Sequence, residues 1–572
     1  MIRVLMVTDA EGSYTAPAQR FGLTELVEAL EDGGCQVTKA HRWNDGMANT
    51  AGADISSFKF AAPFFDPDNY DEVWLVGFAS KNPAGPYKDP AGFELSDAEV
   101  AVLAQFMNDG GGVFATGDHD DLGADLCAKV PRVRSMRKWT ADYGWLDHLD
   151  NLAAFTPDAT KSPPPVGPFR LDTLDTGHNT HYEFQDQSDD IPQKIDPVMR
   201  VIRQHITHVA GGNVGWMESV PHPLLCGPKG VINVLPDHMH EGRCEVPSDL
   251  SKTFIINAQA HDEYPKRSDG TRVSPEVVAW ANVKSRTKDP NFDDPTEDLR
   301  DSNTNVNGDD FPVIVAYNGR LAKVGRVVVD STFHHFTNIN VTGVKADFAS
   351  EPDPDNSIKG VGFLASPEGV AHYDNIKAYW RNIAKWLCRP TTFKQFAWQQ
   401  LKEIATDARF KQIALTGKHA TARYTKYQGA TAWKMLTTTH SPCTVLNTIF
   451  DVAIPDPLSY LLSYTAYIKL TLPDPPPIEV TRRDLAVDKL ELVYYTLGAI
   501  VAELREPHNR ELILTGKLDA ERGIELVQRA AVHGLQLGMK EQAKAMERTL
   551  RALKQTIDIS ETIAATRGGK GN

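Results

Sequence analysis

Three short segments of the chain place histidine beside carboxylate residues directly after a predicted strand. The first is Gly117–Asp121, in which His119 stands between Asp118 and Asp120. A tight glycine turn after a strand projects its central side chain above the sheet edge, so His119 is placed to act as a general base or a metal ligand. Asp118 would assist it in catalysis, and Asp120 would be a second ligand. The alternative is an aspartate-rich turn that caps the next helix, because turns select Asp and Gly in any case.

The second segment is Pro236–Gly242, which follows a predicted strand at Val231–Leu235 and contains His238, His240 and Glu241. Two histidines that are two residues apart in an extended segment point to the same side, a geometry that suits a metal ion. Glu241 would complete the shell or orient the rings. The alternative is a surface loop that happens to contain histidine.

The third segment, Asp330–His335, starts with the last residue of a predicted strand at Arg326–Asp330. Successive residues along a strand point to opposite faces, so we expect only one of the two histidines to enter the site. We favour His334 as a second general acid or base and keep His335 as a candidate metal ligand. The alternative is that both histidines cap the sheet through hydrogen bonds.

These segments lie far apart in the sequence, but each comes after a strand. Sites in open α/β sheets lie beyond the carboxyl ends of the strands, so we expect the three segments to meet at one edge. A set of His, Asp and Glu without thiolates suits Zn²⁺, Mn²⁺ or Fe²⁺. The chemistry would be attack of a metal-activated water on an ester, amide or glycosyl centre. No nucleotide cofactor is indicated, because the chain has neither GxGxxG nor GxxxxGK[ST].

Three further residues are candidates for binding the substrate. Arg132 and Arg134 belong to a local basic cluster after the glycine turn and, if extended, share a face that suits a phosphate or carboxylate. Asp9 ends the first predicted strand and would line the same crevice. Solvation of the arginines, or internal pairing with the abundant acidic residues, is the alternative.

The elements that must position these residues alternate between strand and helix over the first 390 residues. Ile2–Val7 is a continuous apolar run typical of a buried parallel strand. Ser96–Met107 is predicted as a helix, with Ser96 and Glu99 forming a capping box. The pattern predicts an α/β fold with a doubly wound, mostly parallel sheet. Its other predicted elements are helices at Phe21–Leu30 and Asp374–Cys388, the latter ended by Pro390, and strands at Cys35–Ala40, Val73–Val76, Val113–Thr116 and Val313–Ala316.

Two regions differ from this alternation. Residues 129–308 are irregular and are interpreted as a large insertion that decorates the sheet. From Thr391 to Asn572 helical patterns dominate, so we expect an all-α domain with a proline-rich break at Pro473–Pro477. Its last predicted helix, Ala520–Ile557, is long and amphipathic, which favours a homo-oligomer formed through the C-terminal helices.

Composition narrows the partners and the compartment. The net charge of −15 disfavours an extended nucleic-acid surface or an anionic membrane surface. The N-terminus lacks the apolar region of a signal peptide, and Pro457–Leu472, the most apolar later stretch, is too short and polar to span a bilayer. We therefore expect a cytoplasmic protein. Scattered cysteines without a CxxC pair fit free thiols in a reducing compartment: Cys35, Cys127, Cys226, Cys244, Cys388 and Cys443.

The first 390 residues resemble the class I glutamine amidotransferase-like superfamily, and within it the trehalose-utilisation (ThuA-like) branch. The resemblance rests on Gly110–Gly112, the strand and glycine turn that follow, and the late segment GRVVVDSTFHH. It implies a flavodoxin-like, amidotransferase-like sheet in which the late strand end delivers a histidine toward the turn. The helical C-terminal third is not part of the resemblance.

The sequence departs from the amidotransferases at the catalytic turn. Their turn is G-x-C-x-G, whereas this chain has His119 at the cysteine position, so cysteine-dependent glutaminase chemistry by the family route is excluded. We therefore expect a metal-assisted hydrolase acting on a small molecule that neither composition nor motifs identify. The alternative is a catalytically inactive ligand-binding or assembly protein. Carbohydrate processing is a third reading, by analogy with the ThuA-like branch alone.

Overall fold

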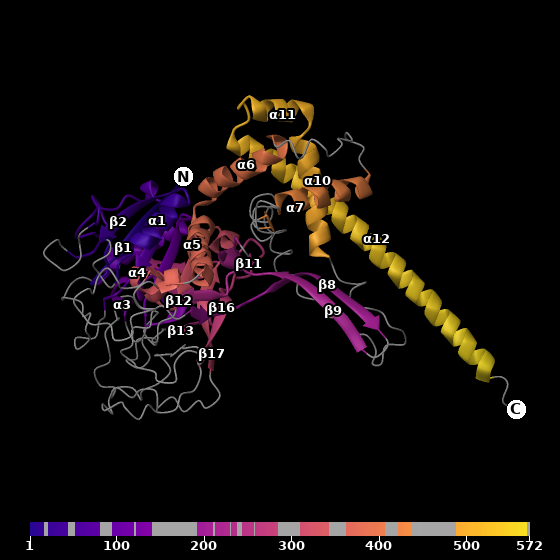
Figure 1. Ribbon diagram of the computed structural model, residues 1–572, viewed down its shortest axis with the longest axis horizontal. Helices are drawn as coiled ribbons and strands as arrows, with labels where there is room; N and C mark the ends of the chain where they lie inside the picture. Colours follow the sequence, from indigo (N-terminus) through magenta and orange to yellow (C-terminus); the bar gives the residue numbers. More distant parts are fainter. Residues whose placement is uncertain are drawn as a thin grey trace. The chain divides into compact units, whose positions relative to one another are not determined.

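The computed structural model divides the chain into two compact units (Figure 1), Met1–Val198 with Pro221–Phe393 and Met199–Val220 with Lys394–Asn572. The predicted domain boundary at residue 390 lies close to this division. The described residues are 1–15, 21–43, 52–79, 94–118, 122–139, 192–209, 212–228, 230–236, 243–256, 258–283, 309–342, 362–365, 367–406, 421–437, 445–446 and 488–568.

An eight-stranded sheet in the order β2-β1-β3-β4-β18-β17-β16-β7 organises the first unit. The strands from β2 to β18 in this order are parallel, whereas β17, β16 and β7 are antiparallel to their neighbours. An α/β fold with a mostly parallel sheet is therefore confirmed. The strands are β1 Ile2–Thr8, β2 Cys35–His41, β3 Glu72–Val76, β4 Gly112–Thr116, β7 Asp196–Pro197, β16 Glu276–Val283, β17 Asp309–Tyr317 and β18 Val327–Asp330.

Apolar side chains leave both faces of β1, which explains why its sequence is a continuous apolar run. Val4 and Met6 pack in a core that includes α1 (Thr24–Asp32) and α5 (Pro367–Leu387). Leu5 and Val7 pack in a second core with residues of two other helices, α2 (Asp97–Asn108) and α3 (Ala124–Cys127). The sheet is thus covered on both faces.

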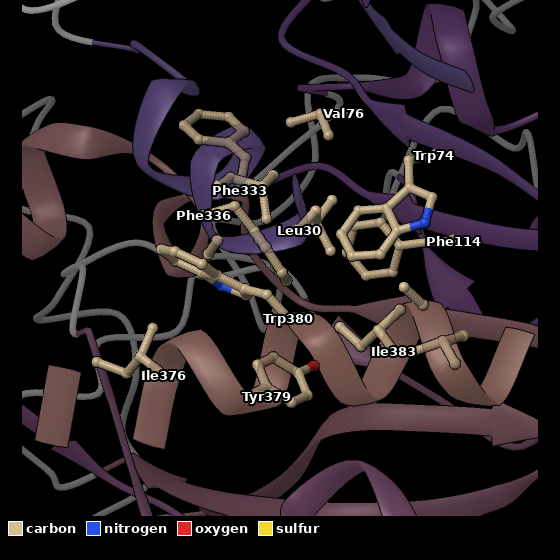
Figure 2. Packing of buried hydrophobic residues seen from close by; sticks show 14 of the residues in the cluster. Leu30, Trp74, Val76, Phe114, Phe333, Phe336, Ile376, Tyr379, Trp380 and Ile383 are labelled. Atoms are coloured by element: carbon tan, nitrogen blue, oxygen red, sulfur yellow. The ribbon is translucent and has the colours of Figure 1, made fainter. Parts of the chain in front are cut away.

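The α5 helix presents an aromatic face to its core. Figure 2 shows Trp380, Tyr379 and Ile383 of this helix beside Trp74 of β3 and Phe114 of β4. The rings of Trp74 and Phe114 lie 4.6 Å apart between centroids, and Phe336 lies 4.8 Å from Phe114. This packing fixes the segment that follows β18, which bears the candidate histidines.

The capping box predicted for α2 is confirmed. The hydroxyl of Ser96 accepts a hydrogen bond from the backbone N–H of Glu99, and the Glu99 carboxylate accepts from the backbone N–H of Ser96. Glu99 also pairs with the buried guanidinium of Arg42 at 2.7 Å. The same carboxylate therefore both starts the helix and joins it to the segment after β2.

We expect the interactions of Glu99 to make the free energy of unfolding depend on pH in the acidic range. Burial by itself raises the pKa of this carboxyl, but the hydrogen bonds and charge of Arg42 and the bonds from Ser96 outweigh it and hold the pKa below its ordinary value of 4.5. The stabilisation is therefore complete above that value and is lost as the pH falls through the lower, folded-state pKa. Glu99→Gln should flatten this acid dependence in urea unfolding, whereas Glu31→Gln, at an exposed position of α1, should leave it unchanged.

The interpretation of residues 129–308 as decoration needs correction. Strands β7 and β16 belong to the central sheet and extend it beyond β17, and a hairpin of β8 (Arg200–Val209) and β9 (Gly212–Val220) belongs to the second unit. The predicted strand at Val231–Leu235 is two short strands, β11 Gly230–Val231 and β12 Val234–Pro236. The other short strands are β5 Arg137–Lys138, β6 Pro192–Lys194, β10 Cys226–Gly227, β13 Arg243–Cys244, β14 Thr253–Ile256 and β15 Gln259–Asp262.

Helices dominate the described part of the second unit, which agrees with the predicted helical C-terminal region. The backbones of α7 (Ala422–Leu436) and α10 (Lys489–Leu504) are in close contact. A Cβ atom on Gly429 of α7 would lie 1.6 Å from the carbonyl oxygen of Tyr494 of α10. The predicted proline-rich break at 473–477 lies outside the described residues, and Pro390 begins a helix as well as following one. The helices are α6 Pro390–Thr406, α7 Ala422–Leu436, α10 Lys489–Leu504, α11 Pro507–Leu514 and α12 Ala520–Gly568. Within the described ranges, every helix is too short or too polar to span a bilayer.

Candidate active site at the carboxyl edge of the sheet

Four neighbouring parallel strands, β1, β3, β4 and β18, end at the same edge of the sheet and lead into polar residues. Asp9 follows β1, Asp118 follows β4 by two residues, and Ser331–His335 follows β18. The segment after β18 forms a short 3-10 turn, η6 (Phe333–His335). The sheet topology therefore brings together residues that are more than three hundred positions apart.

The turn after β4 depends on glycine. A Cβ atom on Gly117 would lie 2.3 Å from the carbonyl oxygen of Leu122, and the backbone N–H of Asp118 donates to that same oxygen at 3.1 Å. Gly123 has a φ of +85°, and its N–H donates to the carbonyl oxygen of Ala79 at 2.8 Å. These contacts hold the turn against the segment after β3 and bury Asp118.

Asp118 and His334 form the central pair of the site. The Asp118 Oδ2 lies 3.4 Å from the His334 Nε2, and both side chains are almost completely buried. The other ring nitrogen, Nδ1, lies 3.0 Å from the Oδ1 of Asn340, which also accepts a hydrogen bond from the hydroxyl of Thr337. Both nitrogens of His334 thus face oxygen atoms, and the pair can hold one proton between the carboxylate and the imidazole.

Aromatic rings fix the orientation of His334. The ring of Phe333 lies 4.4 Å from the imidazole between centroids, and that of Phe21 lies 5.9 Å away. Phe78, from the segment after β3, packs on Phe333 at 4.4 Å. The hydroxyl of Thr332 accepts a hydrogen bond from the His334 backbone N–H. The imidazole is therefore held by packing as well as by hydrogen bonds, as a proton-transfer group requires.

Arg137 joins the two strand exits, a role that the sequence did not reveal. Its buried guanidinium donates to the carbonyl oxygens of Asp118 and Ser331, the latter at 2.7 Å, and lies 4.5 Å from the ring of Trp139. The backbone adds a direct bond between the same exits, from the N–H of Phe333 to the carbonyl oxygen of Gly117 at 2.6 Å. Burial lowers the pKa of Arg137, and nearby acidic groups oppose this effect.

His335 points to a different set of partners from His334. Its Nδ1 lies 2.8 Å from Asp330 Oδ1, and the Asp330 Oδ2 accepts a hydrogen bond from the hydroxyl of Tyr379 at 2.7 Å. The backbone carbonyl of His335 accepts from the indole N–H of Trp380. The two histidines therefore diverge as expected, but they do so from the 3-10 turn η6 and not from a strand, and the contacts of His335 agree with a capping role for this residue.

Asp9 lies at the predicted edge but is buried. Its Oδ1 accepts hydrogen bonds from the backbone N–H groups of Phe78 and Ala79, at 2.7 and 3.0 Å. The carboxylate therefore shapes the segment after β3, and we assign it to that role instead of direct contact with a substrate.

The placement of Arg132 and Arg134 corrects the premise of an extended segment with a shared face. Residues around them form turns, and Arg132 has a φ of +70°. Arg134 donates to Glu263 Oε2 at 2.8 Å, and the backbone N–H of Arg132 donates to Glu263 Oε1 at 2.7 Å. All three side chains are buried, so we assign the two arginines to internal pairing and not to substrate binding.

We expect Arg134→Lys to lower the free energy of unfolding by about 1.5–3 kcal/mol, because lysine keeps the charge but loses one of the two paired donors that match the Glu263 carboxylate. Urea unfolding measures this change in the free energy of unfolding. Lys544→Arg, at an exposed ion pair of α12, is the control. A loss of ligand binding without loss of stability would instead restore the substrate-binding interpretation.

Most of the predicted metal ligands lie outside the described residues: His119, Asp120, His238, His240 and Glu241. Within the described part of the chain, no three His, Cys, Asp or Glu side chains gather in a way that would hold a metal ion. Strand β12, which leads into residues 237–241, contacts η6. The metal centre therefore stays a prediction.

Two cysteines lie near the site but are poor nucleophiles. Cys127 is buried under the glycine turn, where burial raises its pKa well above the ordinary value. Cys244 is also buried, with its thiol 3.5 Å from the carbonyl oxygen of Val313. A thiolate is the reactive form, so neither residue is suited to cysteine-dependent hydrolysis.

Comparison with known proteins adds little to this geometry. No model of a known protein family matches the chain, and no curated protein matches it. A solved structure described as cytoplasmic protein STM3548 from Salmonella typhimurium is similar at 12% identity, covering 68% of this chain and 99% of that one with a TM-score of 0.26. At that score the similarity carries no argument about function, so the family of this chain is not shown.

Proposed function

We propose that the protein is a hydrolase in which Asp118 and His334 form the general acid–base pair that transfers a proton during hydrolysis. The observation that supports it is the 3.4 Å separation of Asp118 Oδ2 and His334 Nε2, two buried groups delivered by neighbouring strand exits. The pair lies beyond the carboxyl ends of β4 and β18, where open α/β sheets place their sites, and this position supports a role in acid–base chemistry. Asn340 would hold the imidazole in place through Nδ1.

We further propose that a divalent metal ion, Zn²⁺, Mn²⁺ or Fe²⁺, activates the attacking water. Its ligands would come from His119, Asp120, His238, His240 and Glu241, which lie outside the described residues and are proposed from the sequence pattern. His335 is a further proposed ligand, and because Asp330 engages its Nδ1, Nε2 would be the nitrogen that binds the metal. The substrate would be a small molecule with an ester, amide or glycosyl centre.

We also propose that the central sheet is doubly wound and of the flavodoxin-like, amidotransferase-like class. The family we propose as related to this chain is the ThuA-like branch. The order β2-β1-β3-β4-β18 supports this, because it runs outward from β1 in both directions with helices on both faces. A cytoplasmic location is proposed with it.

The alternative is a binding or assembly protein whose α/β unit no longer catalyses a reaction. The long α12 helix favours this second function. The two differ in whether the full chain turns over any substrate.

The test is a hydrolysis screen of the full chain against chromogenic esters, amides, glycosides and phosphoesters, with and without added Zn²⁺, Mn²⁺ or Fe²⁺. Metal content of the purified protein is measured in parallel. Turnover that disappears in Asp118→Asn would support the enzyme proposal. A stoichiometric metal without turnover, or neither, would favour the binding protein.

A further inference from the structure

The C-terminal half of α12 extends beyond the helices that it packs against. Gln542 is the last residue of α12 with a buried side chain among those described, and its amide group exchanges two hydrogen bonds with the backbone of Asp488. The helix then continues to Gly568, a further 26 residues (568 − 542) or about 39 Å. Figure 1 shows this part of α12 (yellow) running past the ends of α7 and α10.

This segment carries a seven-residue repeat whose seam positions are apolar except for Ser560. The spacing alternates between three and four residues, which is the pattern of a coiled-coil seam. The seam positions are Met539, Ala543, Met546, Leu550, Leu553, Ile557, Ser560 and Ala564. Two of the large members are half exposed, Met539 at 49% and Leu550 at 50%, so this seam is not covered within the described chain.

The charges beside the seam indicate what covers it. Taking Ala543 as position a, the e positions are Lys540, Glu547, Lys554 and Glu561, which alternate in sign. The g positions carry no charge: Gln542, Thr549, Thr556 and Ile563. In a parallel pair e faces g, so these charges would have no partner across the seam. In an antiparallel pair e faces e, and every lysine would meet a glutamate of the other copy.

We propose that residues 539–564 of α12 pair with the same segment of a second copy of this chain, in an antiparallel two-stranded coiled coil. Lys540 would lie opposite Glu561 of the partner subunit, and Glu547 opposite Lys554 of the partner subunit. The association covers the exposed Leu550 and Met539. It deepens the oligomer expected from the C-terminal helices and does not depend on the proposed hydrolysis.

Sedimentation equilibrium of the full chain tests this over a dilution series. We expect a mass of twice 63.2 kDa, falling to that of one chain on dilution. Leu550→Glu should leave the protein monomeric throughout, whereas Gln555→Lys, at an exposed position on the far side of the helix, should still dimerise. Circular dichroism verifies that each variant keeps its helices.

Two charge-reversal variants distinguish an antiparallel from a parallel pairing of the two α12 helices. Glu547→Lys/Glu561→Lys makes every e position basic, and Lys540→Glu/Lys554→Glu makes every e position acidic. Each variant alone should be monomeric, and an equal mixture should recover the dimer. A wild-type chain that stays monomeric would overturn the proposal, and so would a dimer that survives in both variants. Neither result would bear on turnover, which is measured separately.

Discussion

Replacing His334 with glutamine is expected to lower kcat/KM by about 10²–10⁴-fold, the range that a positioned acid or base contributes. Glutamine is close in size and can still bond Asn340, so the packing of Phe21 and Phe333 around this position should persist. It cannot exchange a proton with Asp118. The measurement is steady-state hydrolysis of the substrate found in the screen, with urea unfolding of the same preparation.

Asp118→Asn provides the second arm of this experiment. If the two groups share one proton, the double variant should lose no more activity than either single one, because groups that act as a unit are not additive. His533→Gln, at an exposed position of α12, is the control and should retain full activity. If instead the losses of activity in the two single variants multiply in the double variant, and the pH profile of activity is unchanged, the Asp118–His334 pair only supports the structure.

The sequence predicted the structure well where a feature depends on residues that are close together along the chain. The Ser96–Glu99 box, the apolar run of β1 and the order of elements up to β4 follow from short-range patterns, and each element predicted as far as β4 is present with small shifts at its ends. The convergence of the segments after β4 and β18 followed from the rule for strand ends, and the Asp118–His334 distance agrees with it.

Other features depend on partners that no local pattern reveals. Arg132 and Arg134 have the composition of an anion site, but the partner that neutralises them, Glu263, lies about 130 residues later in the chain. Strand β16 joins the sheet through pairing with β17, although its own sequence lies in an irregular region. Arg137 looks like one member of a basic cluster until the two carbonyl oxygens it bridges are brought together by the fold.

Arg137→Met is expected to lower the free energy of unfolding by about 3–6 kcal/mol, because hydrogen bonds from a charged donor contribute about 1.5–3 kcal/mol each and two buried carbonyl oxygens would lose theirs. Methionine preserves much of the volume under Trp139 but donates no hydrogen bond. The freed exits after β4 and β18 would let Asp118 and His334 move apart. We therefore expect loss of activity beyond the fraction unfolded, with a larger fall in kcat than rise in KM.

Arg389→Met is the matched control for Arg137. Arg389 also donates to backbone carbonyl oxygens, those of Tyr70, Asp109 and Pro67, but these precede β3 and β4 at the opposite edge of the sheet. Its bonds are more exposed, so the variant should cost about 1–2 kcal/mol and spare kcat. Equal effects of the two variants on kcat would mean that Arg137 acts through general stability, whereas a selective loss in Arg137→Met would assign it to positioning the proton-transfer pair.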